Sequence, residues 1–519
     1  MSVVRPRILA FAFSEASFEL VDRWSASGEL PTFKHLRDTG TWGQLRCAPP
    51  YVTPLMWSTI LTGTNAGRHG VFDFWQRAAD GRIREVDRRS IKQPCLWDML
   101  AASGLRSGFF NVPLTYPPPR FPGFVISGQD APGAHPDIAE PRTLYAEIIE
   151  HFGRLPFKEI FPGGRRKQDY LELFDQDAEA RSAVLEHVIR TRDEPLILIY
   201  NSATAMAQHY FWSDMSAPSD NPYHDIVLRA FQGMDRLMAR VIDAAQGEVQ
   251  VFAFSECGAG PLWRGVALNT WLAAIGLLKP RHAAAASVQT SDRGAQPFNL
   301  LRHARHRVQQ VLPLSLQRHL NRRLGPLKRW IQHRSELGYI DWRATRAYTR
   351  GKEGSLFINL AGREPHGIVQ PGSAYEAVRD ELIERLQELR DPSTDALPVA
   401  RAYRPEELFA GPCLEFAPDI IVEWRNGEYM SAEQREFSGE IFCERWREYM
   451  SWPTSGSHRS NGIFFAAGPG IARRGRLDAV NLLDLAPTLL HAAGAAVPAG
   501  LEGRVAQEIF NDPGSSRSI

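Results

Sequence analysis

Short apolar runs recur along the chain, and a helical pattern follows most of them. The runs do not alternate apolar with polar residues, which is typical of strands buried on both faces of a parallel sheet. The predicted strands are Ile8–Phe13, Gly108–Val112, Phe124–Ser127, Pro195–Tyr200, Val249–Ser255, Asp419–Trp424 and Gly462–Ala467. The predicted helices include Phe18–Ser25, Leu55–Thr62, Leu96–Ala102, Tyr145–Phe152, Asp177–Arg192 and Tyr375–Leu389. This alternation predicts an α/β fold with a mostly parallel central sheet sandwiched by helices.

The first apolar run follows two basic residues, Arg5 and Arg7, close to the N-terminus. It stops at Ser14-Glu15, and no small-residue cleavage site follows, so we expect a buried first strand rather than a signal peptide. No apolar stretch reaches the roughly 18 residues that a membrane-spanning helix needs, and we predict no such span.

One segment departs from the pattern of strands and helices. Between Arg302 and Arg334 the chain is rich in Arg and contains no Asp or Glu, while Leu and Val recur at roughly helical spacing. We predict a helical basic insertion, a cap or linker, at residues 281–337. It divides an α/β core at residues 1–280 and 338–511, and residues 512–519 form a flexible tail. The basic face is either only solvated or contacts an anionic substrate, a protein partner or an anionic membrane surface.

Charge and cysteine content narrow the function classes. The 519 residues carry 60 Lys plus Arg and 59 Asp plus Glu, a formal net charge of +1. This balance argues against a globally basic nucleic-acid binder, and we expect no sequence-specific nucleic-acid role. Five cysteines, odd in number and widely spaced, do not form a disulfide framework. They favour a reducing compartment, and we predict a cytoplasmic protein.

Candidate chemistry follows the predicted strands, because ligands of parallel sheets bind beyond the carboxyl ends of the strands. Thr53-Pro54 opens a helix, with Thr53 predicted as the N-cap residue. The free N–H groups there form an anion site, and the Thr53 hydroxyl becomes a nucleophile if something deprotonates it. The alternative is a plain helix cap.

Three further positions carry potential metal ligands. His209 follows the strand that ends at Tyr200, and its alternative role is packing among aromatic residues. Glu256 and Cys257 directly follow Val249–Ser255 and are candidate ligands or acid–base groups, although a buried structural cysteine is equally open. His458 lies in a loop of small residues before the last predicted strand.

Nearly the whole chain resembles the type I phosphodiesterase/nucleotide pyrophosphatase branch of the alkaline phosphatase superfamily. The motifs that carry the resemblance are residues 30–33, 54–63, 69–74, 111–118, 258–261, 358–365, 417–419, 455–459 and 484–488. It implies an alkaline-phosphatase-like fold and two metal ions, usually zinc, at the carboxyl edge of the sheet. In the family, a Thr or Ser alkoxide bound to one ion attacks phosphorus, and the second ion helps stabilise the opposite oxygen.

The resemblance places the nucleophile at Thr53 and retains two histidine ligands, His209 and His458. The family's other ligands are carboxylates and an Asp-His pair. Here Ser14 stands where the family has an Asp after the first strand, and Ala205 replaces the Asp in the loop before His209. Glu256-Cys257 replaces the Asp-His pair.

These departures predict a degenerate metal site. One metal position is left with His209 and His458, and the other with Thr53, Glu256, Cys257 and Ser14. Two dications need anionic ligands to offset their charge and desolvation. We therefore expect two-zinc phosphodiester hydrolysis to be absent or severely impaired. Whether Glu15 or Asp214 replaces a lost ligand is open.

Two hypotheses follow. In the first, the protein is non-hydrolytic or repurposed and binds a small anionic ligand of the phosphate or sulfate type at Thr53 and Arg459, or acts as a scaffold. In the second, it is a remodelled hydrolase or group transferase. A single zinc or iron is then held by His209, His458 and either Cys257 or Glu256, or a Cys257 thiolate is the nucleophile with a histidine as base.

Overall fold

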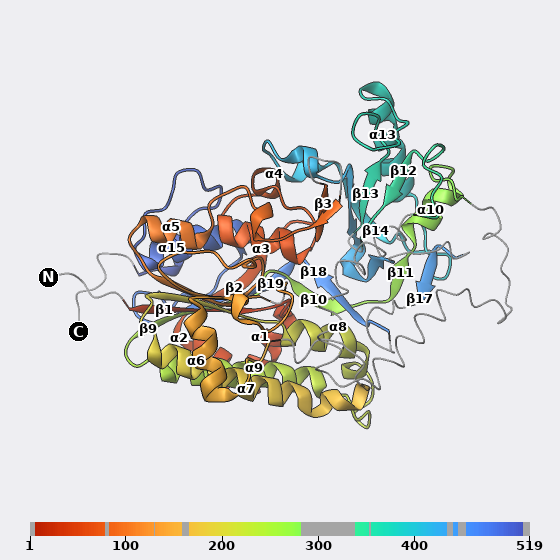
Figure 1. Ribbon diagram of the computed structural model, residues 1–519. Coiled ribbons are helices and arrows are strands. Elements are labelled where there is room, and N and C mark those ends of the chain that lie inside the picture. Colours follow the sequence, from red (N-terminus) through yellow and green to blue (C-terminus); the bar gives the residue numbers. More distant parts are fainter. Residues whose placement is uncertain are drawn as a thin grey trace.

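The computed structural model describes residues 6–77, 83–128, 130–157, 166–281, 338–351, 354–432, 440–444 and 453–511. A ten-stranded sheet lies at its centre, between two layers of helices (Figure 1). The strands, in sequence order, are β1 (Arg7–Phe13), β2 (Thr41–Arg46), β5 (Ser107–Val112), β6 (Gly123–Ser127), β7 (Ala139–Glu140), β8 (Leu196–Asn201), β9 (Val249–Phe254), β19 (Asn461–Ala467), β20 (Gly475–Arg476) and β21 (Val480–Asn481). Their order across the sheet is β20-β2-β19-β9-β1-β8-β5-β6-β7, and β21 also pairs with β2.

The sheet is mostly parallel, as predicted. Strands β9, β1, β8, β5 and β6 run parallel to one another, whereas β7 and β19 run antiparallel to their neighbours. Strand β1 shows why its apolar run does not alternate. Leu9, Phe11 and Phe13 pack into the core on one face, and Ile8, Ala10 and Ala12 pack into the core on the other. Both faces are therefore buried, which requires apolar residues at every position.

Helices cover both faces of the sheet (Figure 1). One layer contains α1 (Phe18–Ser27), α2 (Pro31–Thr39), α6 (Arg142–Phe152), α7 (Tyr170–Thr191), α8 (Ala203–Met215) and α9 (Ile226–Ala244). The other contains α3 (Thr53–Thr62), α4 (Ala66–His69), α5 (Leu96–Ala102) and α15 (Leu485–Ala493). The predicted helices in this core are confirmed, although α7 begins at Tyr170, seven residues before the predicted start at Asp177.

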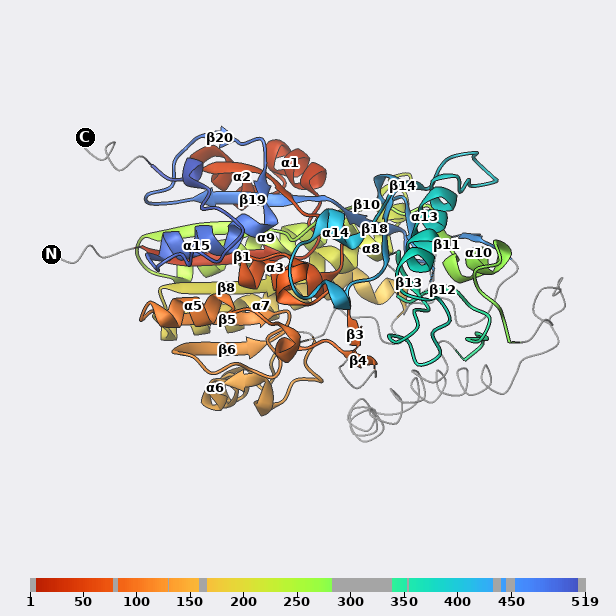
Figure 2. The same cartoon turned by 90° about the horizontal axis from the view of Figure 1, so that it is seen from above.

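A smaller unit, the accessory subdomain, lies beyond the carboxyl ends of the central strands (Figure 2). Its four-stranded antiparallel sheet has the order β12-β13-β15-β14. It has its own apolar core. Its elements are α10 (Leu268–Ala274), β11 (Arg264–Val266), β12 (Ala347–Thr349), β13 (Ser355–Ile358), α13 (Ser373–Gln387), β14 (Val399–Tyr403), β15 (Ile420–Trp424), β16 (Tyr429–Ser431) and β17 (Phe442–Glu444). The predicted strand Asp419–Trp424 is β15, so it belongs to this sheet and not to the central one.

Short elements complete the described chain. They are β3 (Trp75–Arg77), β4 (Ile83–Glu85), β10 (Gly258–Pro261), α14 (Pro405–Leu408), β18 (Gly456–Arg459) and the 3-10 helices η1 (Arg88–Ser90), η2 (Pro136–Ile138), η3 (Lys167–Asp169), η5 (Leu414–Phe416), η6 (Arg425–Gly427), η7 (Leu482–Asp484) and η8 (Gln507–Ile509). The antiparallel pair β10–β18 joins the two halves of the chain near the carboxyl edge of the central sheet.

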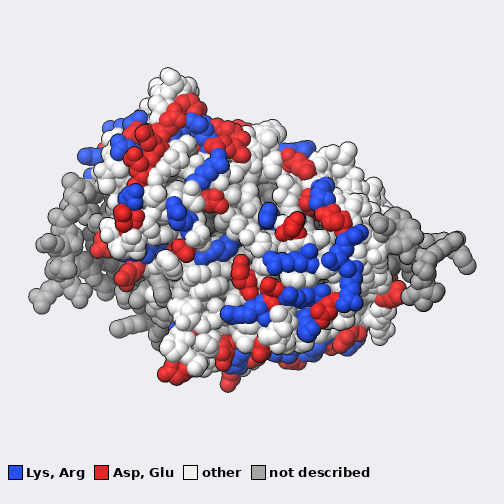
Figure 3. All heavy atoms as spheres, turned by 180° about the vertical axis from the view of Figure 1, so that it is seen from behind, with Lys and Arg blue, Asp and Glu red and all other residues white. Residues whose placement is uncertain are grey.

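The predicted basic insertion, apart from Arg281, and the predicted tail lie outside the described residues. The Arg-rich stretch of the insertion, Arg302–Arg334, therefore also lies outside the described residues. Within the described residues, no helix combines the length and the apolar character needed to cross a membrane. On the face shown in Figure 3, Lys and Arg side chains lie among Asp and Glu side chains, in keeping with the nearly balanced charge of the sequence.

Candidate metal centre

Three side chains from distant parts of the sequence meet at the carboxyl edge of the sheet. Glu15 follows β1, His209 lies on α8 after β8, and His458 lies on β18. Glu15 Oε2 is 2.7 Å from His209 Nε2, and Glu15 Oε1 is 3.2 Å from His458 Nε2. One ligand atom from each of the three residues lies within 4.8 Å of the other two. One carboxylate and two imidazoles form a suitable ligand set for a divalent ion such as zinc or iron.

The charge of Glu15 fits this role. The residue is buried, with 5% of its surface exposed. Although burial alone would raise its pKa, His209 and His458 hold the pKa of Glu15 well below its usual range. The carboxylate is thus ionised at neutral pH. Its Oε2 atom accepts no hydrogen bond of good geometry, although it lies 2.7 Å from His209 Nε2.

His209 is oriented for binding through one ring nitrogen. Its Nδ1 atom lies 2.9 Å from the carbonyl oxygen of Gly456. A carbonyl oxygen only accepts hydrogen bonds, so Nδ1 carries a proton, and Nε2 is the nitrogen that faces Glu15. Metal-binding histidines are commonly fixed in this way by a backbone carbonyl. The residues present therefore fit a single bound metal ion.

Helix α8 positions the Ser14–Glu15 turn. Thr204 donates a hydrogen bond to the carbonyl oxygen of Ser14 (2.6 Å), and the Gln208 amide donates one to the carbonyl oxygen of Glu15 (2.8 Å). Glu15 has a φ of 56°, in the left-handed region, which costs a non-glycine residue about 1–2 kcal/mol. These contacts hold the strained backbone that directs the carboxylate to the histidines.

A glycine allows strand β18 to approach α8 closely. A Cβ atom on Gly456 would lie 2.3 Å from the carbonyl oxygen of Gln208. The neighbouring Ser455 N–H donates a 2.7 Å hydrogen bond to the carbonyl oxygen of His209. This close approach brings the rings of His209 and His458 to a centroid distance of 5.2 Å.

Ser14 and Glu256 bind each other next to this cluster. The Ser14 hydroxyl donates a 2.8 Å hydrogen bond to Glu256 Oε1. Glu256 is fully buried, and this burial, together with the charge of Glu15, raises its pKa to about 7. Near neutral pH this carboxyl is partly protonated. The position that resembles the family's second metal site therefore offers one weakly ionised carboxyl and one neutral hydroxyl.

The structure places the remaining predicted site residues as follows. Cys257 has no exposed surface and packs in the apolar core. Thr53 is half-buried and is the first residue of α3; the N-cap residue is Val52, not Thr53 as predicted from the sequence. The helix simply begins one residue earlier, an uncertainty inherent in assigning helix ends.

Arg459 is a predicted anion-binding residue whose donors are directed at the backbone. Its guanidinium donates hydrogen bonds to the carbonyl oxygens of Ser457 (3.3 Å), His458 (2.9 Å) and Pro261 (2.6 Å). Burial lowers its pKa to about 10. These bonds hold β10 and β18 together, and anion binding by Arg459 stays a prediction.

Glu15, and not Asp214, is the carboxylate that lies beside the two histidines. Ala205 is buried one helical turn before His209, on the same face of α8. Asp214 instead forms an ion pair with Lys167 at 2.6 Å and accepts a hydrogen bond from Asn221.

Comparisons with known proteins agree with this architecture. A family model described as type I phosphodiesterase/nucleotide pyrophosphatase matches residues 11–449. Comparison with the curated proteins finds no match. The structure of human ectonucleotide pyrophosphatase/phosphodiesterase 5 is similar, with 13% identity and a TM-score of 0.52, covering 98% of this chain and 100% of that one.

Two other solved structures are similar over comparable lengths. Phosphonoacetate hydrolase from Sinorhizobium meliloti 1021, in complex with phosphonoformate, has 14% identity and a TM-score of 0.53, covering 95% of this chain and 96% of that one. The wild-type alkaline phosphatase PafA has 13% identity and a TM-score of 0.52, covering 98% of this chain and 100% of that one. At these identities the likeness shows the alkaline-phosphatase-like fold, which confirms the predicted fold class.

Proposed function

Since the chain belongs to the type I phosphodiesterase/nucleotide pyrophosphatase family, we propose that it uses a single-metal site in place of the two-metal centre of that family. Glu15, His209 and His458 would hold the ion, zinc or iron. The observation that carries this proposal is the closeness of their ligand atoms, all within 4.8 Å. When bound, such an ion supplies positive charge that attracts and polarises an anion.

The available charge supports one ion rather than two. Two dications carry four positive charges, and each costs several kcal/mol to desolvate unless anionic ligands compensate it. Glu15 and Glu256 together provide at most two negative charges. Ser14 and Ala205 provide none. We therefore propose that ordinary two-zinc phosphodiester hydrolysis is absent or severely impaired.

A small anion of the phosphate or sulfate type is the proposed ligand. It would bind at the metal site and at the N-terminus of α3, where backbone N–H groups and the helix dipole favour negative charge. Thr53 begins this helix. Without a metal beside it, its hydroxyl stays protonated and donates a hydrogen bond rather than acting as a nucleophile.

A one-metal hydrolase or group transferase is the second candidate. Glu256 favours it, since a buried carboxyl with a pKa of about 7 can accept or give a proton near neutral pH. A Cys257 thiolate has less support, because reactive cysteines need partial exposure and Cys257 has none.

None of the five cysteines forms a disulfide, which is in keeping with a cytoplasmic protein.

Metal binding and turnover of a nitrophenyl phosphodiester test these proposals together. The purified protein is titrated with Zn²⁺ or Fe²⁺ and then with inorganic phosphate, and hydrolysis is followed with the wild type, Thr53→Ala and Glu256→Gln. We expect one equivalent of metal, metal-dependent phosphate binding and no turnover. One equivalent with turnover that Glu256→Gln abolishes would favour the second candidate. Two equivalents with turnover lost in Thr53→Ala would overturn the single-metal proposal.

A further inference from the structure

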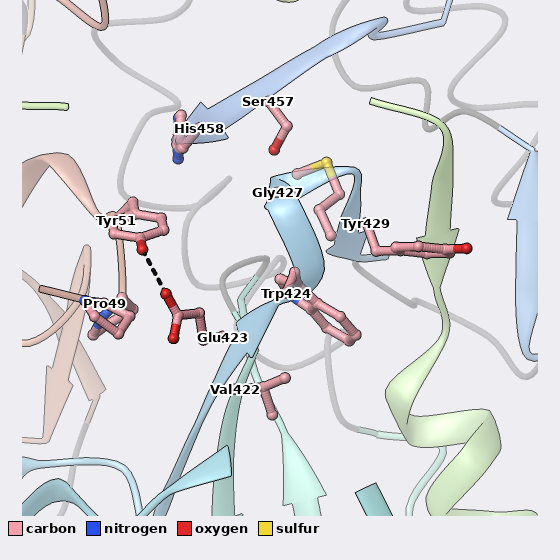
Figure 4. A pocket seen from close by; sticks show the side chains of 11 residues that line it. Pro49, Tyr51, Val422, Glu423, Trp424, Gly427, Tyr429, Ser457 and His458 are labelled. Carbon is pink, nitrogen blue, oxygen red and sulfur yellow. Dashed lines mark hydrogen bonds between the residues drawn. The ribbon is translucent and has the colours of Figure 1, made fainter. Parts of the chain in front are cut away.

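A narrow pocket opens beside the metal centre, between the α/β core and the accessory subdomain (Figure 4). His458 lines both the pocket and the metal centre. Tyr51 comes from the loop before α3, and Glu423 and Trp424 come from the end of β15. A ligand held at the metal centre could therefore extend directly into this pocket.

The pocket contains a carboxylate fixed in place by two tyrosines. Tyr51 donates a 2.9 Å hydrogen bond to Glu423 Oε1, which Figure 4 shows as a dashed line, and Tyr403 donates a 2.8 Å bond to Oε2. A carboxylate offers about four lone-pair sites, so two remain for a ligand. Burial, followed by the charge of Glu423, raises the pKa of Tyr51, so the Tyr51 hydroxyl keeps its proton and donates it to the carboxylate.

No cation of the described chain neutralises Glu423. Its cross-strand neighbour Arg401 binds Glu407 at 2.7 Å and lies over the ring of Tyr403. Among the described residues, no Lys, Arg or His forms an ion pair with Glu423. A half-buried carboxylate that lacks a partner charge, in a pocket with aromatic walls, favours a positively charged guest.

The size of the pocket restricts this guest. It has slightly more room than one water molecule needs. A primary ammonium group has about that size and carries three donors, whereas a quaternary ammonium group is much larger. The metal centre, which His458 also lines, would bind the anionic end of the same ligand.

We propose that this pocket binds the primary ammonium group of a ligand whose phosphate-type group lies at the metal centre. The ligand class is therefore an aminoalkyl phosphate or phosphonate, or an ester of one. The proposal rests on the proposed function, because the metal centre must hold the anionic end. Glu423 is then a specificity-determining residue, and Tyr51 and Tyr403 are positioning residues.

Calorimetric titration of the metal-loaded protein with matched ligand pairs tests this proposal. The probes are 2-aminoethyl, 3-aminopropyl and 4-aminobutyl phosphate, each compared with the alkyl phosphate in which a methyl group replaces the ammonium. At neutral pH, at least one amine should bind about tenfold or more tightly than its neutral partner. The preference should vanish in Glu423→Gln and persist in Glu384→Gln, a matched change on the exposed face of α13.

The outcomes separate this inference from the proposed function. Equal binding of amine and alkyl phosphates, with metal and phosphate binding intact, would overturn the ammonium pocket and leave the metal centre standing. A preference that survives in Glu423→Gln would also overturn it. Absence of metal and phosphate binding would overturn both proposals. If Glu423→Gln does not fold, the matched ligand pairs still test the proposal on the wild type. The ammonium pocket predicts that the wild type binds the amine more tightly than its neutral partner, and equal binding would overturn it.

Discussion

Replacing Glu15 with Gln removes the only full negative charge among the three proposed ligands and keeps the shape of the side chain. The amide oxygen could still reach the metal, so the change isolates the charge. A carboxylate and a divalent ion whose charges are centred about 4 Å apart attract each other by about 8 kcal/mol at an effective dielectric constant of 20, and the desolvation of the two groups offsets about half of this. A loss of about 3–4 kcal/mol corresponds to metal binding weakened about 100- to 1,000-fold.

Competition with a chromophoric chelator measures this loss directly. The wild type, Glu15→Gln and Glu29→Gln are titrated with Zn²⁺ at neutral pH. Glu29 is an exposed carboxylate that accepts a hydrogen bond from Gln232 on the surface, so its replacement tests the loss of an ordinary surface charge. We expect Glu29→Gln to bind zinc as tightly as the wild type does.

Two results would refute this reasoning. Zinc affinity unchanged within about threefold in Glu15→Gln would mean that the carboxylate is not a ligand, since the loss predicted from its charge is at least 30 times larger. A wild type that binds no zinc would mean that the three residues do not form a metal site.

Three further changes probe the structure around the site. Burial lowers the pKa of His69 to about 3. Below about pH 6.5 the unfolded chain therefore takes up a proton that the native chain does not, and the free energy of unfolding should fall by about 1.4 kcal/mol per pH unit. In urea unfolding, His69→Gln should lack this part of the pH dependence. The pKa of Glu256, raised to about 7, means that the native state holds this proton more tightly than the unfolded state, so stability is lost as pH rises from about 4.5 to 7. Glu256→Gln should therefore stabilise the metal-free protein by about 3 kcal/mol at pH 8 and by little at pH 4.5, and equal effects at both pH values would contradict this. Gly456→Ala should lower the free energy of unfolding in urea by about 1–3 kcal/mol and weaken zinc binding, because the added Cβ would collide with the carbonyl oxygen of Gln208. Unchanged stability and zinc affinity would show that β18 does not need this close approach.

The central sheet could be predicted because burial on both faces leaves a clear mark on the sequence. Strand β1 buries consecutive residues in opposite cores, so its run is apolar at every position. The pattern does not say which sheet a strand joins. Asp419–Trp424 looks the same as the central strands, yet β15 pairs with β13 and β14 in the accessory subdomain. Pairing depends on contacts between residues far apart in the chain, which a local pattern does not contain.

The site was predicted in part for a related reason. His209 and His458 stand at the positions that the family resemblance gives, and the structure brings them together. Ser14, not Glu15, occupies the family position after β1, and neighbouring residues of an extended chain point in opposite directions. Glu15 reaches the histidines because its backbone adopts a left-handed conformation, held by Thr204 and Gln208. A single sequence gives no sign of that turn. Glu423 was missed because the local sequence does not show that its strand, β15, ends beside His458.

An anomalous difference map from crystals grown with zinc decides most directly whether one ion has replaced two. We expect one peak, bound by Glu15, His209 and His458, and zinc analysis of the same protein should give one equivalent. Two fully occupied peaks bridged by the Thr53 hydroxyl would contradict the single-metal site, and so would a single peak at Glu256 and Cys257.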